Sequence, residues 1–200
     1  MYPYHIGRQK GTIKPLQPTG LTLKKELMSD HLKSLGYKTH VVGKWHLGFC
    51  RLEFTPTWRG FDSFRGFYTG AEHHYSHKRS GFYDFRVNNT VDLSVQGKYS
   101  TDIFTHVANN VIKEHKSSSK KSEPLFLYVP FQSVHAPLEA PKVELKRLKQ
   151  RRSRRRRSLN EARQIFRAMM ARVDKGVYSI ANTLKREGMW DNTILGRESF

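Results

Sequence analysis

The sequence of 200 residues has a single cysteine, few acidic residues and no long apolar run. Because Cys50 has no second cysteine to pair with, an internal disulfide framework is excluded. No apolar stretch approaches the roughly 18 residues of a membrane span, and no signal peptide is expected from the first residues. The composition, with 37% hydrophobic and 12% aromatic residues, is typical of one globular domain.

Basic residues outnumber acidic residues by 36 to 17, which gives a formal net charge of +19. Ten of the basic residues lie between residues 142 and 157, where Glu144 is the single acid. A block of like charge repels itself, so we predict a solvated basic insertion at about 142–157 without apolar periodicity. The functional alternatives are nuclear targeting, or contact with nucleic acid or a heparin-like polyanion through Arg151–Arg157. The block has no aromatic residue that could stack on a single-stranded nucleic acid.

The periodicity of apolar residues predicts alternating helices and strands. Helices are expected from Thr22 to Gly36, from Ser100 onward and over 158–187, and strands over 39–42, over 125–129 and from residue 193. The continuous apolar run at 125–129 is typical of a buried central strand. The first helix is expected to bury Leu23, Leu27, Met28, Leu32 and Leu35, and the third Ile165, Met169, Met170, Val173, Val177, Ile180 and Leu184. With loops and short strands over 49–99, this order predicts an α/β fold with a mostly parallel sheet flanked by helices.

Two loops carry cationic side chains directly after predicted strands. Lys44 and His46 follow the strand at 39–42, and His135 follows the strand at 125–129. If these strands are neighbours, their carboxyl ends bring the three side chains together. A pocket of this kind suits a tetrahedral oxyanion such as sulfate or phosphate, and its histidines can transfer protons near neutral pH. Lys44 and His135 are therefore candidate substrate-binding residues, and His46 and His135 are candidate catalytic residues; solvated loop side chains are the simpler alternative.

Six segments resemble the type I sulfatases, in particular the arylsulfatase B-like branch, in order and in spacing. The most specific is the stretch 36–48, which is similar to the family signature GY-x-T-x-x-x-GKWHLG. The others lie at 59–64, 99–104, 124–128, 132–138 and 188–193. The resemblance covers most of the chain outside the basic block.

This resemblance implies an internal portion, residues 1–200, of the catalytic domain of a sulfuric ester hydrolase with an alkaline-phosphatase-like fold. In such enzymes a cysteine in a C-x-P-S-R motif becomes formylglycine, whose hydrate attacks sulfur, while calcium polarises the sulfate. By motif, Lys44 would bind a sulfate oxygen, His46 would hydrogen-bond the formylglycine hydroxyl, and His135 would contact the sulfate and protonate the departing oxygen. The implied substrate is a sulfate ester of a sugar or an aryl alcohol, and the implied location is lysosomal or secreted.

The 200 residues depart from the family pattern at the nucleophile and at the metal. They contain no C-x-P-S-R, because Cys50 lies in the context Phe-Cys-Arg after the signature. The paired aspartates that bind calcium are absent, and Asp191-Asn192 precedes the position of the family's Asp-Asn pair. We therefore expect no metal site and no turnover from these residues alone. The alternatives are a non-catalytic sulfatase-like anion-binding protein, a polyanion-binding module acting through the basic block, and a phosphatase or phosphonate hydrolase of the same superfamily.

Three smaller features complete the sequence analysis. Trp45, between Lys44 and His46, is expected to pack and to fix the loop. The cluster His73, His74 and His77 has no acid or cysteine spaced to complete a zinc site, and Glu72 and His74 are expected to border the substrate pocket by the family resemblance. Asn88 opens the sequon Asn-Asn-Thr and is a candidate for glycosylation.

Overall fold

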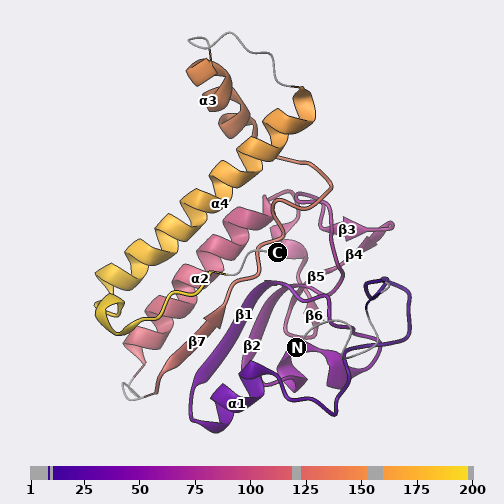
Figure 1. Ribbon diagram of the computed structural model, residues 1–200, viewed down its shortest axis with the longest axis vertical. Coiled ribbons are helices and arrows are strands. Elements are labelled where there is room, and N and C mark those ends of the chain that lie inside the picture. The colour runs from indigo at the N-terminus through magenta and orange to yellow at the C-terminus, as the bar shows by residue number, and fades with distance from the viewer. Residues whose placement is uncertain (1–8, 10, 119–122, 153–159, 198–200) are drawn as a thin grey trace.

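The computed structural model describes residue 9 and residues 11–118, 123–152 and 160–197 (Figure 1). Its main sheet has five strands in the order β6-β5-β2-β1-β7. β1 (Lys38–Lys44) runs parallel to β2 (Ser63–Phe67) and to β7 (Leu125–Tyr128). β5 (Phe85–Val87) pairs antiparallel with β2 on one side and with β6 (Thr90–Val91) on the other. β3 (Lys78–Arg79) and β4 (Phe82–Tyr83) form a separate hairpin. The predicted α/β class, with a mostly parallel sheet between helices, is confirmed.

The alternation of side chains along β1 explains why both faces of the sheet are covered. Successive residues of a strand point to opposite faces, and Val41 and Val42 belong to two different apolar clusters. Val42 packs with Phe67 and Phe85 against α2 (Ser100–Ser117), which begins where the sequence predicts. Val41 faces the other side, in a cluster with Trp45, Phe61, Phe64 and Tyr68.

α4 (Glu161–Arg186) lies against α2 and extends the layer toward β7 (Figure 1). Its start is fixed by Asn160, whose Oδ1 accepts a hydrogen bond from the Arg163 amide at 2.9 Å. Ile180 and Leu184 are buried between the two helices as predicted. Met170 and Val177 were expected in the core, but they are 37% and 42% exposed. They lie on a side of α4 that faces away from α2.

The first helix is shorter than the sequence predicts. α1 spans only Met28–Ser34, and Asp30 caps it by accepting a hydrogen bond from the Leu27 amide at 2.8 Å. The carbonyl groups of Leu21 and Lys25 instead accept hydrogen bonds from the buried guanidinium of Arg59, at 3.2 and 2.9 Å. Residues 21–26 are thereby held as a loop. The predicted burial is wrong for Leu23, Met28 and Leu35, which are 46%, 62% and 72% exposed.

The strand predicted to be central is at one edge of the described sheet. β7 pairs only with β1 among the described strands, and Tyr128 is 38% exposed. An apolar run shows that a strand is covered on its faces but says nothing about its neighbours in the sheet. Residues 193–195, predicted to begin a strand, form none in the described part of the chain, and Ile194 is fully exposed.

The basic block begins with a helix that has one buried face, so the prediction of a solvated segment is wrong for that face. α3 (Lys142–Arg152) packs on α4 with Leu145 and Leu148 half-buried. Glu144 is 1% exposed, and its carboxylate binds Lys175 and Arg172 of α4. Arg172 also holds Asp102 of α2, with Nη2 to Oδ2 at 2.7 Å. The side chains at 151 and 152 and the whole of 153–157 lie outside what the structure describes, so the predicted contact through Arg151–Arg157 stays a prediction.

No helix among the described residues is long and apolar enough to cross a membrane.

Candidate functional site

Lys44 is the last residue of β1 and lies at the carboxyl edge of the sheet. Its amide donates a hydrogen bond to the carbonyl of Pro130, at 2.9 Å, so the chain leaving β1 is tied to the loop after β7. Gly43 makes this approach possible: its φ is 136°, and a Cβ there would be 2.2 Å from the Pro130 oxygen. Lys44 is half-buried, and burial lowers the pKa of its ammonium group.

Trp45 packs into the core, as predicted, and fixes the loop between the two candidate residues. It is 6% exposed, and its ring meets Phe61 edge-to-face with centroids 6.1 Å apart. The indole Nε1 donates a hydrogen bond to the Phe54 carbonyl at 2.8 Å. Lys44 and His46 are therefore attached to a residue that cannot move freely.

His46 is held in a left-handed backbone conformation with φ of 56°. Its amide donates to the Tyr68 carbonyl at 3.1 Å, and its ring lies against Gly70, where a Cβ would be 2.5 Å from Cε1. The ring Nε2 donates a hydrogen bond to the Ile13 carbonyl at 2.9 Å, because a carbonyl can only accept. In the neutral ring Nδ1 is then the atom that can accept a proton or a hydrogen bond.

The electrostatics of His46 connect the three predicted site residues. Burial lowers the pKa of His46, the hydrogen bond to Ile13 opposes this effect, and the positive charges of Lys44 and His135 lower the pKa further. Both charges therefore act on the imidazole of His46. The structure places all three residues at the carboxyl edge of the neighbouring strands β1 and β7; that they share one sulfate pocket stays a prediction.

His135 is exposed in the loop after β7, and its ring orientation is fixed by a local hydrogen bond. Nδ1 donates to the Ala136 carbonyl at 2.7 Å, and the His135 amide donates to the Gln132 carbonyl at 2.9 Å. The ring nitrogen Nε2 is consequently the atom of His135 available to a ligand.

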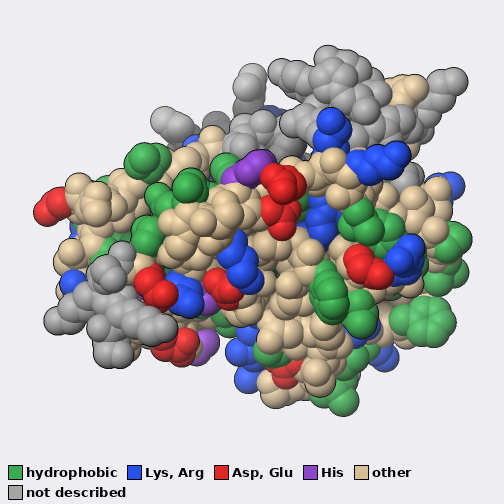
Figure 2. Space-filling model, turned by 90° about the horizontal axis from the view of Figure 1, so that it is seen from below, with side chains coloured by type: hydrophobic (Ala, Val, Ile, Leu, Met, Phe, Trp, Pro, Cys, Tyr) green, Lys and Arg blue, Asp and Glu red, His purple; other side chains and the backbone are tan. Residues whose placement is uncertain are grey.

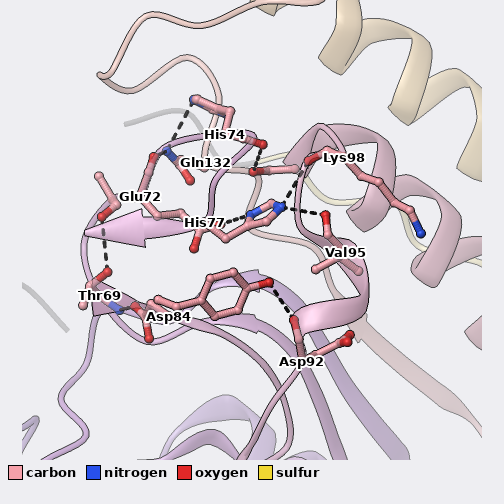
Figure 3. A network of polar contacts seen from close by, with 12 residues as sticks. Thr69, Glu72, His74, His77, Asp84, Asp92, Val95, Lys98 and Gln132 are labelled. Carbon is pink, nitrogen blue, oxygen red and sulfur yellow. Dashed lines mark hydrogen bonds and ion pairs between the residues drawn. The ribbon is translucent and has the colours of Figure 1, made fainter. Parts of the chain in front are cut away.

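A set of long-range contacts anchors the loop that carries His135 (Figure 3). The buried amide of Gln132 donates from Nε2 to the Glu72 carbonyl at 2.5 Å and lies 3.3 Å from the ring Nε2 of His74. Glu139 holds the other end of the loop, because its carboxylate accepts from the His74 amide at 2.6 Å and contacts His73 Nδ1 at 2.8 Å. Local sequence contains no signal for this anchor, because its partners are about sixty residues apart along the chain.

Glu72 and His77 form a buried acid–imidazole pair beside this anchor (Figure 3). His77 Nδ1 lies 2.8 Å from Glu72 Oε1, and both side chains are fully buried. Burial raises the pKa of Glu72 to about 7, against the opposing effect of His77. The prediction that Glu72 and His74 border the substrate pocket is not supported, because neither has exposed surface and their contacts hold the loops together.

The sequon lies at the tip of the β5–β6 hairpin. Asn88 is exposed, and its Oδ1 accepts a hydrogen bond from the Phe64 amide at 2.9 Å. The side-chain nitrogen Nδ2 takes no part in this hydrogen bond. This geometry suits attachment of a glycan at Nδ2. Glycosylation of Asn88 stays a prediction, which the intact mass of protein secreted from mammalian cells would test.

The described residues contain no group of three or more His, Cys, Asp or Glu side chains that could hold a metal ion. They do not fit the oxygen-rich coordination that calcium needs. Cys50 is exposed and outside any C-x-P-S-R motif, so it does not fit the formylglycine precursor. The candidate groups at the carboxyl edge of β1 and β7 are the ammonium of Lys44 and the imidazoles of His46 and His135, and the charge of Arg79 also lowers the pKa of His46.

Comparison with known proteins shows what the chain as a whole is similar to. The family model described as Sulfatase matches residues 1–196. Arylsulfatase J of Mus musculus is 35% identical over 200 residues, which are 97% of this chain and 32% of that protein. An arylsulfatase of Klebsiella aerogenes is 25% identical, over 88% of this chain and 47% of its own length. The crystal structure of Ps i-CgsB in complex with k-i-k-neocarrahexaose superposes with a TM-score of 0.82 at 23% identity, over 96% of this chain and 43% of that one. The chain thus spans between about a third and a half of these relatives.

Proposed function

Because this chain belongs to the sulfatase family, we propose that Lys44, His46 and His135 form the sulfate-binding side of a site that hydrolyses sulfate esters. The observation that carries the proposal is the placement of the three residues at the carboxyl ends of the neighbouring parallel strands β1 and β7, where the Lys44 amide donates a hydrogen bond to the Pro130 carbonyl at 2.9 Å. We further infer that residues 1–200 are an internal portion of a sulfatase catalytic domain.

Each residue has a role that fits its chemistry, and for the two histidines the hydrogen bonds of the ring support it. The ammonium of Lys44 would bind a sulfate oxygen and neutralise the charge that builds on it in the transition state. His135, with Nδ1 occupied by Ala136, would present a protonated Nε2 to the oxygen that leaves the sulfur. His46, neutral and donating from Nε2 to Ile13, would accept a hydrogen bond at Nδ1 from a hydroxyl in the site.

The family resemblance assigns the attacking group to formylglycine and the polarisation of sulfate to calcium. The described residues fit neither group, so the roles proposed for this chain are binding, orientation and proton transfer.

We propose that the 200 residues alone do not turn over a sulfate ester. The rival hypothesis, a non-catalytic anion-binding protein, makes the same prediction for this chain. The transcript upstream of Met1 discriminates between them: an in-frame C-x-P-S-R preceded by paired aspartates favours the enzyme, and a stop codon favours the binding protein.

We infer a sulfated sugar as the substrate, in preference to a simple aryl sulfate. Proteins similar to this chain include the N-acetylgalactosamine-6-sulfatase of Homo sapiens, 29% identical over 62% of this chain, and a structure described with a neocarrahexaose. A lysosomal or secreted location fits such a substrate and fits the exposed sequon at Asn88, and it is part of the same proposal.

The test is equilibrium binding of 4-nitrophenyl sulfate to the purified chain, followed by an assay for release of nitrophenol with calcium present. We expect binding without turnover, and binding should weaken about tenfold or more in Lys44→Met, because a hydrogen bond to a charged group contributes about 1.5–3 kcal/mol. Lys116→Met, which removes an exposed lysine from the last turn of α2, is the matched control. Equal binding by wild type and Lys44→Met would contradict the proposal, and so would turnover clearly above that of a Lys44→Ala/His135→Ala variant.

A further inference from the structure

α3 is docked on the domain by one face and presents basic side chains on the opposite face. The docked face is made by Glu144, Leu145 and Leu148, which are buried or half-buried against α4. The exposed face includes Lys142 and Lys146, one helical turn and about 6 Å apart along the axis, with Arg147 beside them. The helix therefore holds its outward charges in a fixed array.

No carboxylate among the described residues forms an ion pair with Lys142, Lys146 or Arg147. Glu144, the one acid of the block, is directed inward to Lys175 and Arg172. Burial alone would raise the pKa of Glu144, but the hydrogen bonds and charges of Lys175 and Arg172 hold it below its ordinary value, so the carboxylate stays ionised. The positive field of the outer face is thus uncompensated. The face seen in Figure 2 differs, because Lys and Arg side chains there are interspersed with Asp and Glu.

The helix α3 lies beyond the edge of the sheet at which the candidate site is found (Figure 1). It follows the loop that carries His135. Six residues lie between His135 and Lys142, so their Cα atoms are seven steps along the chain and at most about 25 Å apart. Within the segment from His135 to α3, Glu139 binds His73 and His74. At the end of this segment, Glu144 binds Lys175 of α4. A long polyanion could therefore contact α3 and the edge of the sheet together.

From this geometry we propose that the outer face of α3 is a binding surface for a sulfated polysaccharide, which it presents to the site at Lys44 and His135. The link to that site rests on the proposed function, whereas binding to α3 does not. A sulfated polysaccharide fits better than a single-stranded nucleic acid, because α3 has no aromatic side chain on which bases could stack. It also shares the sulfate group for which the neighbouring site is proposed.

Heparin is the probe for this surface. The variant Lys142→Gln/Lys146→Gln/Arg147→Gln removes three outward charges without touching the docked face. Its control, Lys24→Gln/Lys25→Gln/Lys116→Gln, removes three exposed charges from other parts of the surface. We expect the α3 variant to bind heparin roughly tenfold more weakly near physiological salt and with a shallower dependence on log salt, since fewer counterions are released. The control should stay within about twofold of wild type, and both variants should melt as wild type does.

Two results would overturn the proposal. Equal loss of heparin binding in the α3 variant and the control would show that net charge alone is responsible. Double-stranded DNA bound as tightly as heparin, and weakened equally by the α3 variant, would identify a nucleic-acid surface instead. Binding of 4-nitrophenyl sulfate separates this proposal from the proposed function: the α3 variant should retain it. A chain that binds heparin through α3 but binds no aryl sulfate would refute the proposed function and leave the α3 surface standing.

Discussion

Replacing Gly66 by alanine should destabilise the fold by about 3 kcal/mol or more, because overpacking against backbone that cannot yield lies at the upper end of single-residue effects. Gly66 of β2 is paired with Gly43 of β1 in the centre of the sheet. A Cβ at Gly66 would be 1.9 Å from the Gly43 carbonyl oxygen, which is far inside van der Waals contact. Gly43 cannot yield, since it already lies against the Pro130 carbonyl. The two strands would have to separate, and the separation would displace Lys44.

Urea unfolding of Gly66→Ala and wild type measures this effect. Gly11→Ala is the control, because no atom lies within 4 Å of the position that its Cβ would take. At this chain length each kcal/mol corresponds to a change of about 2–4 °C in Tm, so melting should show a shift of about 10 °C. A loss of less than about 1 kcal/mol for Gly66→Ala would mean that the strands are not packed as closely as described.

Glu72→Gln should change the pH dependence of stability more than any surface substitution. The pKa of Glu72 is raised from 4.5 to about 7 by burial. Between these values the folded chain keeps a proton that the unfolded chain has released. The contribution of this group to stability is therefore fully present below pH 4.5 and is lost as the pH rises toward 7. A change of this size corresponds to about 3 kcal/mol at most.

The measurement is the free energy of unfolding of wild type and Glu72→Gln at pH 5 and at pH 8. Because glutamine does not titrate, the stability of the variant relative to wild type should rise between pH 5 and pH 8, by up to about 3 kcal/mol. Glu26→Gln, at an exposed position, controls for the loss of a carboxylate. A difference between Glu72→Gln and wild type that stays constant or falls with pH would contradict the burial of an acid at this position.

The local elements that bury one periodic face could be predicted from the sequence. β1 and α2 lie where the apolar spacing places them, and Ile103, Phe104 and Val107 of α2 pack on the sheet as expected. The positions of Lys44 and His46 at the carboxyl end of β1 and of His135 after β7 were predicted in the same way. In each case the relevant signal extends over a few consecutive residues, so local sequence contains it.

The features that the sequence did not predict depend on partners far along the chain. α1 is short because the guanidinium of Arg59, more than thirty residues later, binds carbonyl groups that a longer helix would need. α3 packs on α4 because Glu144 forms ion pairs with two cations of α4. The local sequence of the basic block does not indicate these ion pairs. The order of strands that leaves β7 at the edge is likewise a property of the whole sheet.

The central claim, that Lys44, His46 and His135 together bind a sulfate group, is tested most directly by NMR of the histidine rings. The pKa of His46 should rise when sulfate is added, because a bound anion favours the imidazolium, and it should rise in Lys44→Met, because a neighbouring positive charge is removed. The ring signals of His135 should shift in the same sulfate titration with the same dissociation constant. Sulfate that shifts neither ring, or a pKa of His46 that is the same in Lys44→Met as in wild type, would contradict the account.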